Sequence, residues 1–435
     1  MTGIRAQDRE ILRLAVPAFL ALVAEPLFLL ADSAVVGHLG TPELAGLGIA
    51  GAVLSTLISL CVFLAYGTTA SVGRRIGAGD EVGALEHGIH GIWLAVTIGV
   101  VTTGAGLVGT PALVGLFGAG SAVADQAETY LRIGVLGAVP LLVMLAATGV
   151  LRGLQDTRTP LAVAVVGNLV NIGLNLVLVY GLHLGIGGSA LGTVVAQLGS
   201  AAALTVVVVR AARRHGVALR PSRAGVLGAG RAGVPLLLRT VTLRAGLLVM
   251  TYGAASFGDT DLAAMQIAMT LWTFLAFTLD AVAIAAQAIT GRYLGAGDLG
   301  GTRAITRRML RWGVGAGVLT GIALAATSPF LGPLFTSDDR VTDLLVPVLL
   351  VAAAAQPLAG VVFVLDGVLI GAGDGAYLAR AGLLVLVVFA PAAWAAISLG
   401  GTLVWLWTAF VVAFMGGRGV VLLARERTTG WMTVG

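Results

Sequence analysis

Apolar runs of about 20 residues or more recur from one end of this chain to the other. A run of that length, wound into an α-helix, spans the hydrocarbon core of a bilayer. Of the 435 residues, 58% are hydrophobic and only 11% are charged, and the mean hydropathy is +0.99. A soluble protein could not cover such a composition with polar surface. The sequence therefore predicts an all-α polytopic membrane protein that is embedded in a lipid bilayer.

Twelve apolar segments have the length of membrane helices. The first six lie near 11–36, 46–73, 88–111, 122–149, 160–183 and 187–211. The second six lie near 232–257, 262–292, 304–328, 340–370, 376–399 and 401–423. We expect two six-helix lobes, an N-lobe at 1–213 and a C-lobe at 232–435, joined by a cytoplasmic linker at 214–231.

Arginine placement predicts the orientation of the helices. The chain has no lysine, so all 26 basic residues are arginine, and they gather at both termini, in the linker and in alternate loops. Loops on the other side are acidic, with Asp259, Asp261, Asp338, Asp339 and Asp343. The positive-inside rule then puts both termini in the cytoplasm, and we expect a multi-pass protein of a bacterial inner (cytoplasmic) membrane. The same distribution explains the net charge of +5 without a nucleic-acid partner.

An internal repeat emerges when the chain is compared with itself at an offset of 218 residues. SVGRRIGAGD (71–80) then aligns with ITGRYLGAGD (289–298), with six of ten positions identical, and VLRGLQD (150–156) aligns with VLIGAGD (368–374). Two copies of six helices share one orientation, so we expect a pseudo-two-fold axis along the membrane normal. The GAGD segments follow long helices rather than strands, which indicates helix-ending turns and not phosphate-binding loops.

Several classes of enzyme are excluded by composition. Without lysine the chain cannot contain a Walker A loop or form a Schiff base. The single Cys61 cannot form an internal disulfide, and no metal-binding motif is present. An intramembrane hydrolase would need a nucleophile–base pair or a metal cluster at membrane depth, and the histidines lie near loops or span ends. We expect no enzymatic activity, no cofactor and no metal.

Four carboxylates lie at membrane depth: Glu25, Asp32, Asp280 and Asp366. A charge at that depth costs from about 3 to more than about 10 kcal/mol, so it calls for a functional reason. None of the four is repeated in the other half; their counterparts at the 218-residue offset are Leu243, Met250, Val62 and Thr148. The scaffold is duplicated but the charges are not, which predicts different roles for the two lobes.

Longer segments resemble one family of transporters. The first half contains DSAVVGHLGTPELAG (32–46), RGLQDTRTPL (152–161) and NLVNIGLNLVLVYGL (168–182), and the second contains LRTVTLRAGLLVM (238–250), FTLDAVAIAAQAITGRYLGAGD (277–298) and FVLDGVLIGAGD (363–374). Together they resemble the multidrug and toxic compound extrusion (MATE) family, and in particular its DinF-like branch. The resemblance covers nearly the whole chain and implies a V-shaped, twelve-helix fold with efflux driven by inward flow of protons or sodium.

The first helix carries the candidate coupling residues. Asp32 would lie roughly 28 Å and Glu25 roughly 18 Å along a helix that starts near Arg13, on nearly the same face. In the resembled family an aspartate of the first helix that matches Asp32 binds the proton or cation; the alternative is a wetted, structural aspartate. Glu25 is the weaker candidate, with a hydrogen bond inside the cavity as its alternative role. Pro26 removes a helix hydrogen bond beside Glu25 and is the predicted hinge.

Three asparagines, Asn168, Asn171 and Asn175, form a polar stripe along the fifth apolar segment. Because exposure of amides to lipid is costly, we expect the stripe to face the N-lobe interior near Asp32. Many members of the resembled family have an aspartate where Asn175 stands, and a neutral residue there favours proton over sodium coupling. Interhelical hydrogen bonding is the alternative role.

The C-lobe contains its own cations. Arg239 and Arg244 lie within the seventh apolar segment, at depths that suggest pairing of Arg239 with Asp366 and of Arg244 with Asp280. Paired charges stay ionised and mainly stabilise structure. We expect a structural charge network, with a direct role in transport as the alternative.

Further candidates concern the cavity. Trp272, Phe274 and Phe277 could hold an aromatic cation through cation–π contacts, or else face lipid and neighbouring helices. The polar side chains of Gln197 and Gln266 are candidate substrate contacts, and Pro357 is a second predicted kink.

These observations together predict a secondary active transporter. We expect a proton-coupled antiporter that exports amphipathic, mostly cationic drugs or toxic metabolites by alternating access, acting as a monomer on small-molecule substrates. The coupling ion is H⁺, with Na⁺ as one alternative; a flippase for lipid-linked precursors is another.

Overall fold

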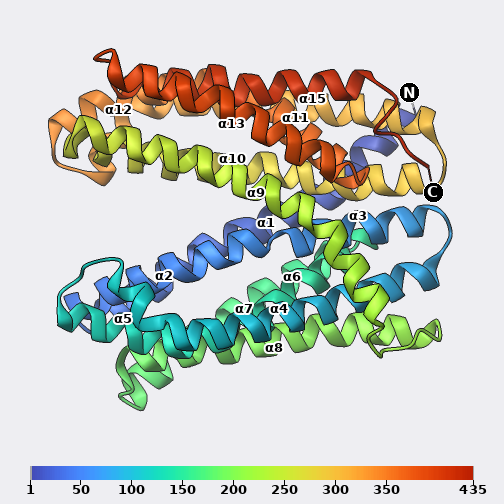
Figure 1. Cartoon of the computed structure of the whole chain (residues 1–435), viewed down its shortest axis with the longest axis horizontal. Helices are drawn as coiled ribbons and strands as arrows, with labels where there is room; N and C mark the ends of the chain where they lie inside the picture. The colour runs from blue at the N-terminus through green and yellow to red at the C-terminus, as the bar shows by residue number, and fades with distance from the viewer. Residues whose placement is uncertain (1, 435) are drawn as a thin grey trace. The chain divides into compact units, whose positions relative to one another are not determined.

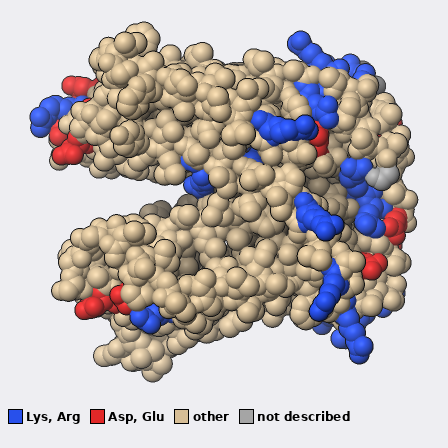
Figure 2. All heavy atoms as spheres, viewed as in Figure 1, with Lys and Arg blue, Asp and Glu red and all other residues tan. Residues whose placement is uncertain are grey.

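The computed structural model describes residues 2–434, with side chains from residue 6 onward. Within that range the structure is built from helices and contains no strand. Twelve stretches are long and apolar enough to cross a membrane, as the sequence predicted. Charged side chains gather where the helices end, and the surface between them is mostly uncharged in the view of Figure 2.

The first half of the chain forms six spans, several of them interrupted (Figure 1). Breaks occur at Val62, between α2 and α3, at the 3₁₀ turn η1, and at the π-helix η2. The elements are α1 (Thr2–Gly37), α2 (Thr41–Cys61), α3 (Phe63–Gly77), α4 (Glu81–Gly115), α5 (Ser121–Gly134), η1 (Val135–Gly137), α6 (Ala138–Gly153), α7 (Arg158–Asn175), η2 (Leu176–Gly181) and α8 (Gly185–Arg214).

The second half has longer uninterrupted helices, until a π-helical segment interrupts the last span. Its elements are α9 (Arg223–Phe257), α10 (Asp259–Gly295), α11 (Leu299–Phe335), α12 (Asp339–Gly371), α13 (Gly375–Ser398), α14 (Leu403–Ala409), η3 (Phe410–Gly416) and α15 (Gly417–Arg427).

Two boundaries differ from those expected. Helix α9 begins at Arg223, so only 215–222 of the predicted linker is non-helical. The last span runs to Arg427, four residues beyond its predicted end near residue 423. Glycine-rich and arginine-rich composition made both segments look like loops, although each continues a helix.

Helices pack into two compact units, one of residues 20–237 and the other of residues 1–19 with 238–435. Helix α1 therefore contributes its first turns to the second unit and the rest to the first, a division that differs from the predicted lobes. Asp8 holds these first turns, accepting hydrogen bonds from Arg308 Nε (2.6 Å) and Nη2 (2.5 Å) and from Trp312 Nε1 (2.8 Å). Two residues further on, Glu10 pairs with Arg292.

The two GAGD segments form equivalent helix-ending turns, as predicted. Gly79 and Gly297 have φ angles of 77° and 72°, a left-handed conformation that glycine adopts without strain. The next residue caps the following helix: Asp80 accepts a hydrogen bond from Gly83 N (2.8 Å) and Asp298 from Gly301 N (2.7 Å). Sequence repeat and structural repeat coincide here.

Close glycine contacts hold α11 against α12. A methyl group on Gly313 would lie 2.6 Å from the Gly360 carbonyl oxygen, and one on Gly317 would lie 2.3 Å from the Gln356 carbonyl oxygen. Only glycine permits such an approach, which is how helices associate where lipid removes the hydrophobic driving force. Pro357 lies inside α12 at this contact; its role as a kink stays a prediction.

Candidate functional site

Asp32 of α1 is buried inside the 20–237 unit, with 4% of its surface exposed. Its Oδ1 accepts hydrogen bonds from Asn175 Nδ2 and Ser189 Oγ, each at 2.7 Å. Its Oδ2 has the hydroxyl of Tyr130 at 3.5 Å. Among the described residues no guanidinium pairs with this carboxylate. The aspartate is therefore buried among neutral donors, and its coupling role stays a prediction.

The asparagine stripe of α7 faces the interior of this unit, as predicted. Asn175 binds Asp32, Asn171 donates to Thr193 Oγ1 on α8 at 3.0 Å, and Asn168 donates to the Ala24 carbonyl at 3.2 Å. Helix α7 continues into η2 directly after Asn175. Such π-helical segments frequently occur at functional sites.

Two amide oxygens beside the aspartate lack partners. Oδ1 of Asn171 and Oδ1 of Asn175 are buried, with no hydrogen-bond donor among the described residues. Buried acceptors of this kind are uncommon in folded proteins and mark places where a further donor or a cation can bind. Gly192 leaves the space for one of them, since a methyl group there would come within 2.2 Å of Asn175 Oδ1.

Glu25 differs from Asp32 in its surroundings. Its side chain is exposed in the structure and makes no hydrogen bond or ion pair with any described residue. Glu25 and Asp32 were expected on nearly the same face of the helix, but their side chains lie in different surroundings. The Asn168 hydrogen bond to Ala24 braces α1 immediately before Glu25 and Pro26; the hinge function of Pro26 stays a prediction.

Sequence reasoning missed the hydroxyl groups of this site. Tyr130 of α5 and Ser189 and Thr193 of α8 complete the surroundings of Asp32 and Asn171. Ser189 and Thr193 lie four residues apart, one helical turn, and this spacing was the only available signal. Tyr130 carried none, because it is a single tyrosine within the predicted span 122–149 and has no patterned polar neighbour.

A charge network occupies the other unit, as expected. Asp366 is buried on α12 and pairs with Arg239, in agreement with the predicted pairing. A second guanidinium, that of Arg418, donates from Nη2 to Asp366 Oδ2 at 3.0 Å. Asp280 interacts electrostatically with Arg418; pairing of Asp280 with Arg244 stays a prediction. Arg418 lies within the predicted last span, 401–423, but was not recognised there as a partner of Asp366.

The aromatic candidates do not share a cavity wall. Trp272 is 7% exposed and packs edge-to-face against Trp407 and Phe410, with ring centroids 5.9 and 5.7 Å apart. Phe274, in contrast, is 53% exposed. The Trp272 indole packs α10 against α14 and η3, which is the alternative role, and a cation–π role for it stays a prediction.

The remaining candidates lie apart from these two sites. Phe277 is half-buried on α10, and Gln266 is exposed on the same helix. Gln197 of α8 lies over Gly137, where a methyl group would meet its Oε1 at 2.3 Å. A role in substrate binding stays a prediction for each.

Comparison with known proteins matches both halves of the chain to one family. The family model MatE matches residues 17–177 and again residues 235–395, two segments displaced by 218 residues. The chain is 31% identical over 401 residues to the chloroplastic Protein DETOXIFICATION 44 of Arabidopsis thaliana, covering 88% of this chain and 75% of that protein. It is 30% identical over 382 residues to DNA damage-inducible protein F of Escherichia coli, covering 86% and 82%.

Solved structures share the fold. A MOP superfamily transporter from Pyrococcus furiosus superposes with a TM-score of 0.88 at 22% identity, covering 98% of this chain and 96% of that one. A MATE crystal structure in a bent conformation gives a TM-score of 0.89 at 22% identity, covering 99% and 98%.

Proposed function

The chain belongs to the MATE family of membrane transporters, and from this premise we propose that it is a proton-coupled antiporter in which Asp32 exchanges its proton for cargo. The cargo is a small, amphipathic and mostly cationic molecule, exported by alternating access. A Thermotoga maritima relative, 24% identical over 347 residues, is described as a probable multidrug resistance protein. Its name supports the breadth of cargo proposed here.

The absence of a positive partner among the described residues around Asp32 is the observation that carries this proposal. Desolvation penalises the charged form of a carboxyl group, whereas a guanidinium neighbour would keep it ionised. Neutral donors allow both forms. A carboxyl group in such a place can be protonated in one conformation and ionised when a cation arrives or water enters.

Hydroxyl groups permit this exchange without movement of heavy atoms. Asp32 Oδ1 already accepts two short hydrogen bonds, so the proton belongs on Oδ2, which has only the long contact with Tyr130. A hydroxyl can donate to a carboxylate or accept from a carboxylic acid by rotation about its C–O bond. Tyr130 can therefore satisfy Asp32 in either state.

Sodium is the second candidate ion, and the two buried amide oxygens favour it. Asn171 Oδ1 and Asn175 Oδ1 have no donor among the described residues. Hard cations bind through carboxylate and amide oxygens of this kind. A single carboxylate gives such a site little charge, so the proton remains the preferred ion.

Energy and location follow from the same proposal. Each inward proton contributes about 2.3 kcal/mol per 100 mV of membrane potential, in addition to its pH gradient. We place the chain in a bacterial inner membrane with both termini in the cytoplasm, acting as a monomer; the arginine-rich loops support this orientation.

Inverted membrane vesicles with an imposed pH gradient test the proposal. Addition of an organic cation should dissipate the gradient in vesicles that contain the wild-type protein. Asp32→Asn should abolish this response, whereas Asp125→Asn, the same change at an exposed position on α5, should keep it. Transport that requires sodium and does not depend on the pH gradient would favour sodium coupling. Full activity of Asp32→Asn would contradict both proton and sodium coupling through Asp32.

A further inference from the structure

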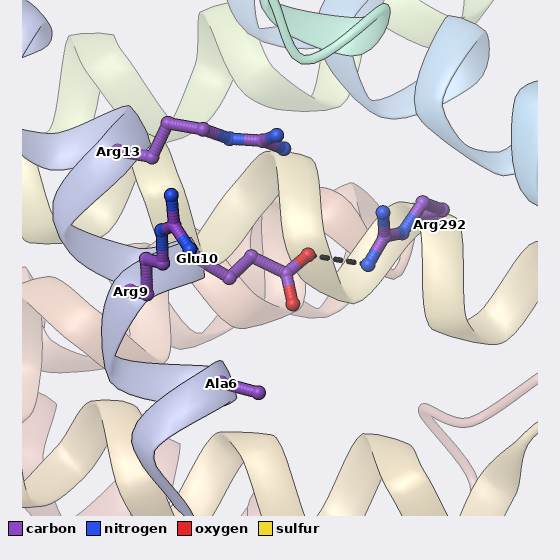
Figure 3. A pocket seen from close by; sticks show the side chains of 5 residues that line it. All are labelled: Ala6, Arg9, Glu10, Arg13 and Arg292. Atoms are coloured by element: carbon purple, nitrogen blue, oxygen red, sulfur yellow. Dashed lines mark hydrogen bonds and ion pairs between the residues drawn. The ribbon is translucent and has the colours of Figure 1, made fainter. Parts of the chain in front are cut away.

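An arginine-lined pocket lies where α1 begins and α10 ends. Its volume is about 550 Å³, and it is lined by Ala6, Arg9, Glu10, Arg13 and Arg292. In Figure 3 the side chains of Arg9, Glu10 and Arg13 project from α1, and Arg292 comes from α10. All five residues belong to the same unit, so the pocket is part of one compact body.

The lining carries more positive than negative charge. Three guanidiniums face one carboxylate, and that carboxylate, of Glu10, is paired with Arg292. The Arg292 guanidinium also lies 5.4 Å from the ring centre of Tyr293. Arg9, in contrast, is exposed and makes no hydrogen bond or ion pair with any described residue. The pocket lining is therefore rich in arginine, and Arg9 offers a guanidinium to an anion.

An apolar strip continues from these arginines along α1. Leu12 and Val16 are 41% and 49% exposed, and they follow Arg9 and Arg13 at spacings of three residues. Residues three and four apart lie on one face of a helix. The exposed face of α1 is thus basic at the start of the span and apolar toward its middle, which matches a molecule with an anionic head and a hydrocarbon tail.

We propose that this pocket binds the phosphate group of an anionic phospholipid, with an acyl chain along Leu12 and Val16. Guanidinium groups bind phosphate oxygens through paired hydrogen bonds, and basic pockets at the ends of membrane helices attract anionic headgroups. A soluble phosphate would use the arginines but leave the apolar strip without a partner. This lipid site is separate from the proposed antiport. The proposal is the same whether protons or sodium ions drive transport.

Native mass spectrometry of the full chain in detergent tests the site with phosphatidylglycerol and phosphatidylcholine as probes. The wild-type protein should retain phosphatidylglycerol in preference. Arg9→Gln/Arg13→Gln should weaken that binding about fivefold for each arginine removed. Arg303→Gln/Arg307→Gln removes the same charge from exposed positions on α11 outside the pocket, and it should change nothing.

Three results would overturn the site. Equal losses of phosphatidylglycerol binding in the two double variants would show that the lipid is attracted to basic surface in general. Unchanged binding in Arg9→Gln/Arg13→Gln would show that these arginines do not bind the lipid. Displacement of the lipid by glycerol 3-phosphate at equal concentration would show that the pocket binds free phosphate esters. If the double variant misfolds, phosphatidylglycerol binding is measured in Arg9→Gln instead. The Arg9 side chain makes no hydrogen bond or ion pair with a described residue, so its loss should not disturb folding.

Discussion

Gly192 of α8 lies directly against the Asn175 side chain of α7, so closely that a methyl group at position 192 would be 2.2 Å from the amide oxygen. Asn175 in turn donates the 2.7 Å hydrogen bond that holds Asp32. The geometry of the carboxylate thus depends on a glycine that does not touch it.

Replacing this glycine should therefore impair transport. In Gly192→Ala the amide of Asn175 must move, and we expect coupled transport to fall by up to about a hundredfold, the size of effect that a misplacement of about 1 Å can produce. The measurement is proton release from inverted vesicles on addition of an organic cation. Gly199→Ala on the same helix is the control, because no atom lies within 4 Å of the added methyl group. Equal activity in the two variants would contradict the prediction.

Loss of Asp366 should destabilise the protein more than loss of one of its arginines. Asp366→Asn leaves the guanidiniums of Arg239 and Arg418 without the carboxylate that now lies between them, and breaking a buried pair in this way costs about 3–5 kcal/mol. Arg239→Gln still leaves Asp366 paired with Arg418. Thermal unfolding in detergent should show the lower midpoint for Asp366→Asn.

The opposite order of midpoints would argue against a structural network. A variant Asp366→Asn that unfolds like the wild type but no longer transports would instead support a direct role for this carboxylate in transport.

Gln155 has a φ angle of 63°, whereas the equivalent position one repeat later is Gly373, with a φ of 77°. The left-handed conformation costs a residue with a side chain about 1–2 kcal/mol relative to glycine. Gln155→Gly should therefore raise the unfolding midpoint, and Gly373→Ala should lower it. A lower midpoint for Gln155→Gly would mean that the side-chain contacts of Gln155 outweigh the backbone strain.

The non-helical segment 215–222, which lies within the 20–237 unit, should loosen as the pH rises. The pKa of His215 is raised from 6.5, first because its Nδ1 hydrogen-bonds the Ala211 carbonyl oxygen and also because its Nε2 binds Glu81; nearby Arg214 opposes the shift. A raised folded-state pKa means that the imidazolium stabilises the attachment fully below pH 6.5, and that this stabilisation is lost as the pH rises through the folded-state pKa.

Hydrogen exchange of residues 216–222 measures this attachment. The ratio of exchange rates in His215→Gln and in the wild type should be large at pH 6 and approach one at high pH, since the ratio cancels the intrinsic pH dependence of exchange. A ratio that does not change with pH would contradict the role of the imidazolium.

The architecture was predictable from sequence because lipid imposes a simple rule. Apolar runs of sufficient length must form helices there, so the spans and the repeat could be read directly. The asparagine stripe was equally accessible, because helical spacing places Asn168, Asn171 and Asn175 on one face. Its orientation toward Asp32 followed from the cost of amides in lipid.

Tertiary contacts of single polar residues were not predictable. Tyr130, Ser189 and Arg418 gain their roles only from the helices that pack beside them, and their spacing along the chain carries little trace of this. Membrane helices are apolar on most faces, so hydropathy does not reveal which neighbour a face contacts. For the same reason the division of α1 between two units was not foreseen.

That division has a mechanical consequence. Helix α1 is held at its start by Asp8 and Glu10 in one unit, and it carries Asp32 into the other. Any rotation of one unit against the other must then flex or twist this helix between its two fixed points, and Pro26 lies in the stretch that has to yield. If Asp32 exchanges its proton as proposed, helix α1 links that exchange to the residues that hold its start, Asp8 and Glu10.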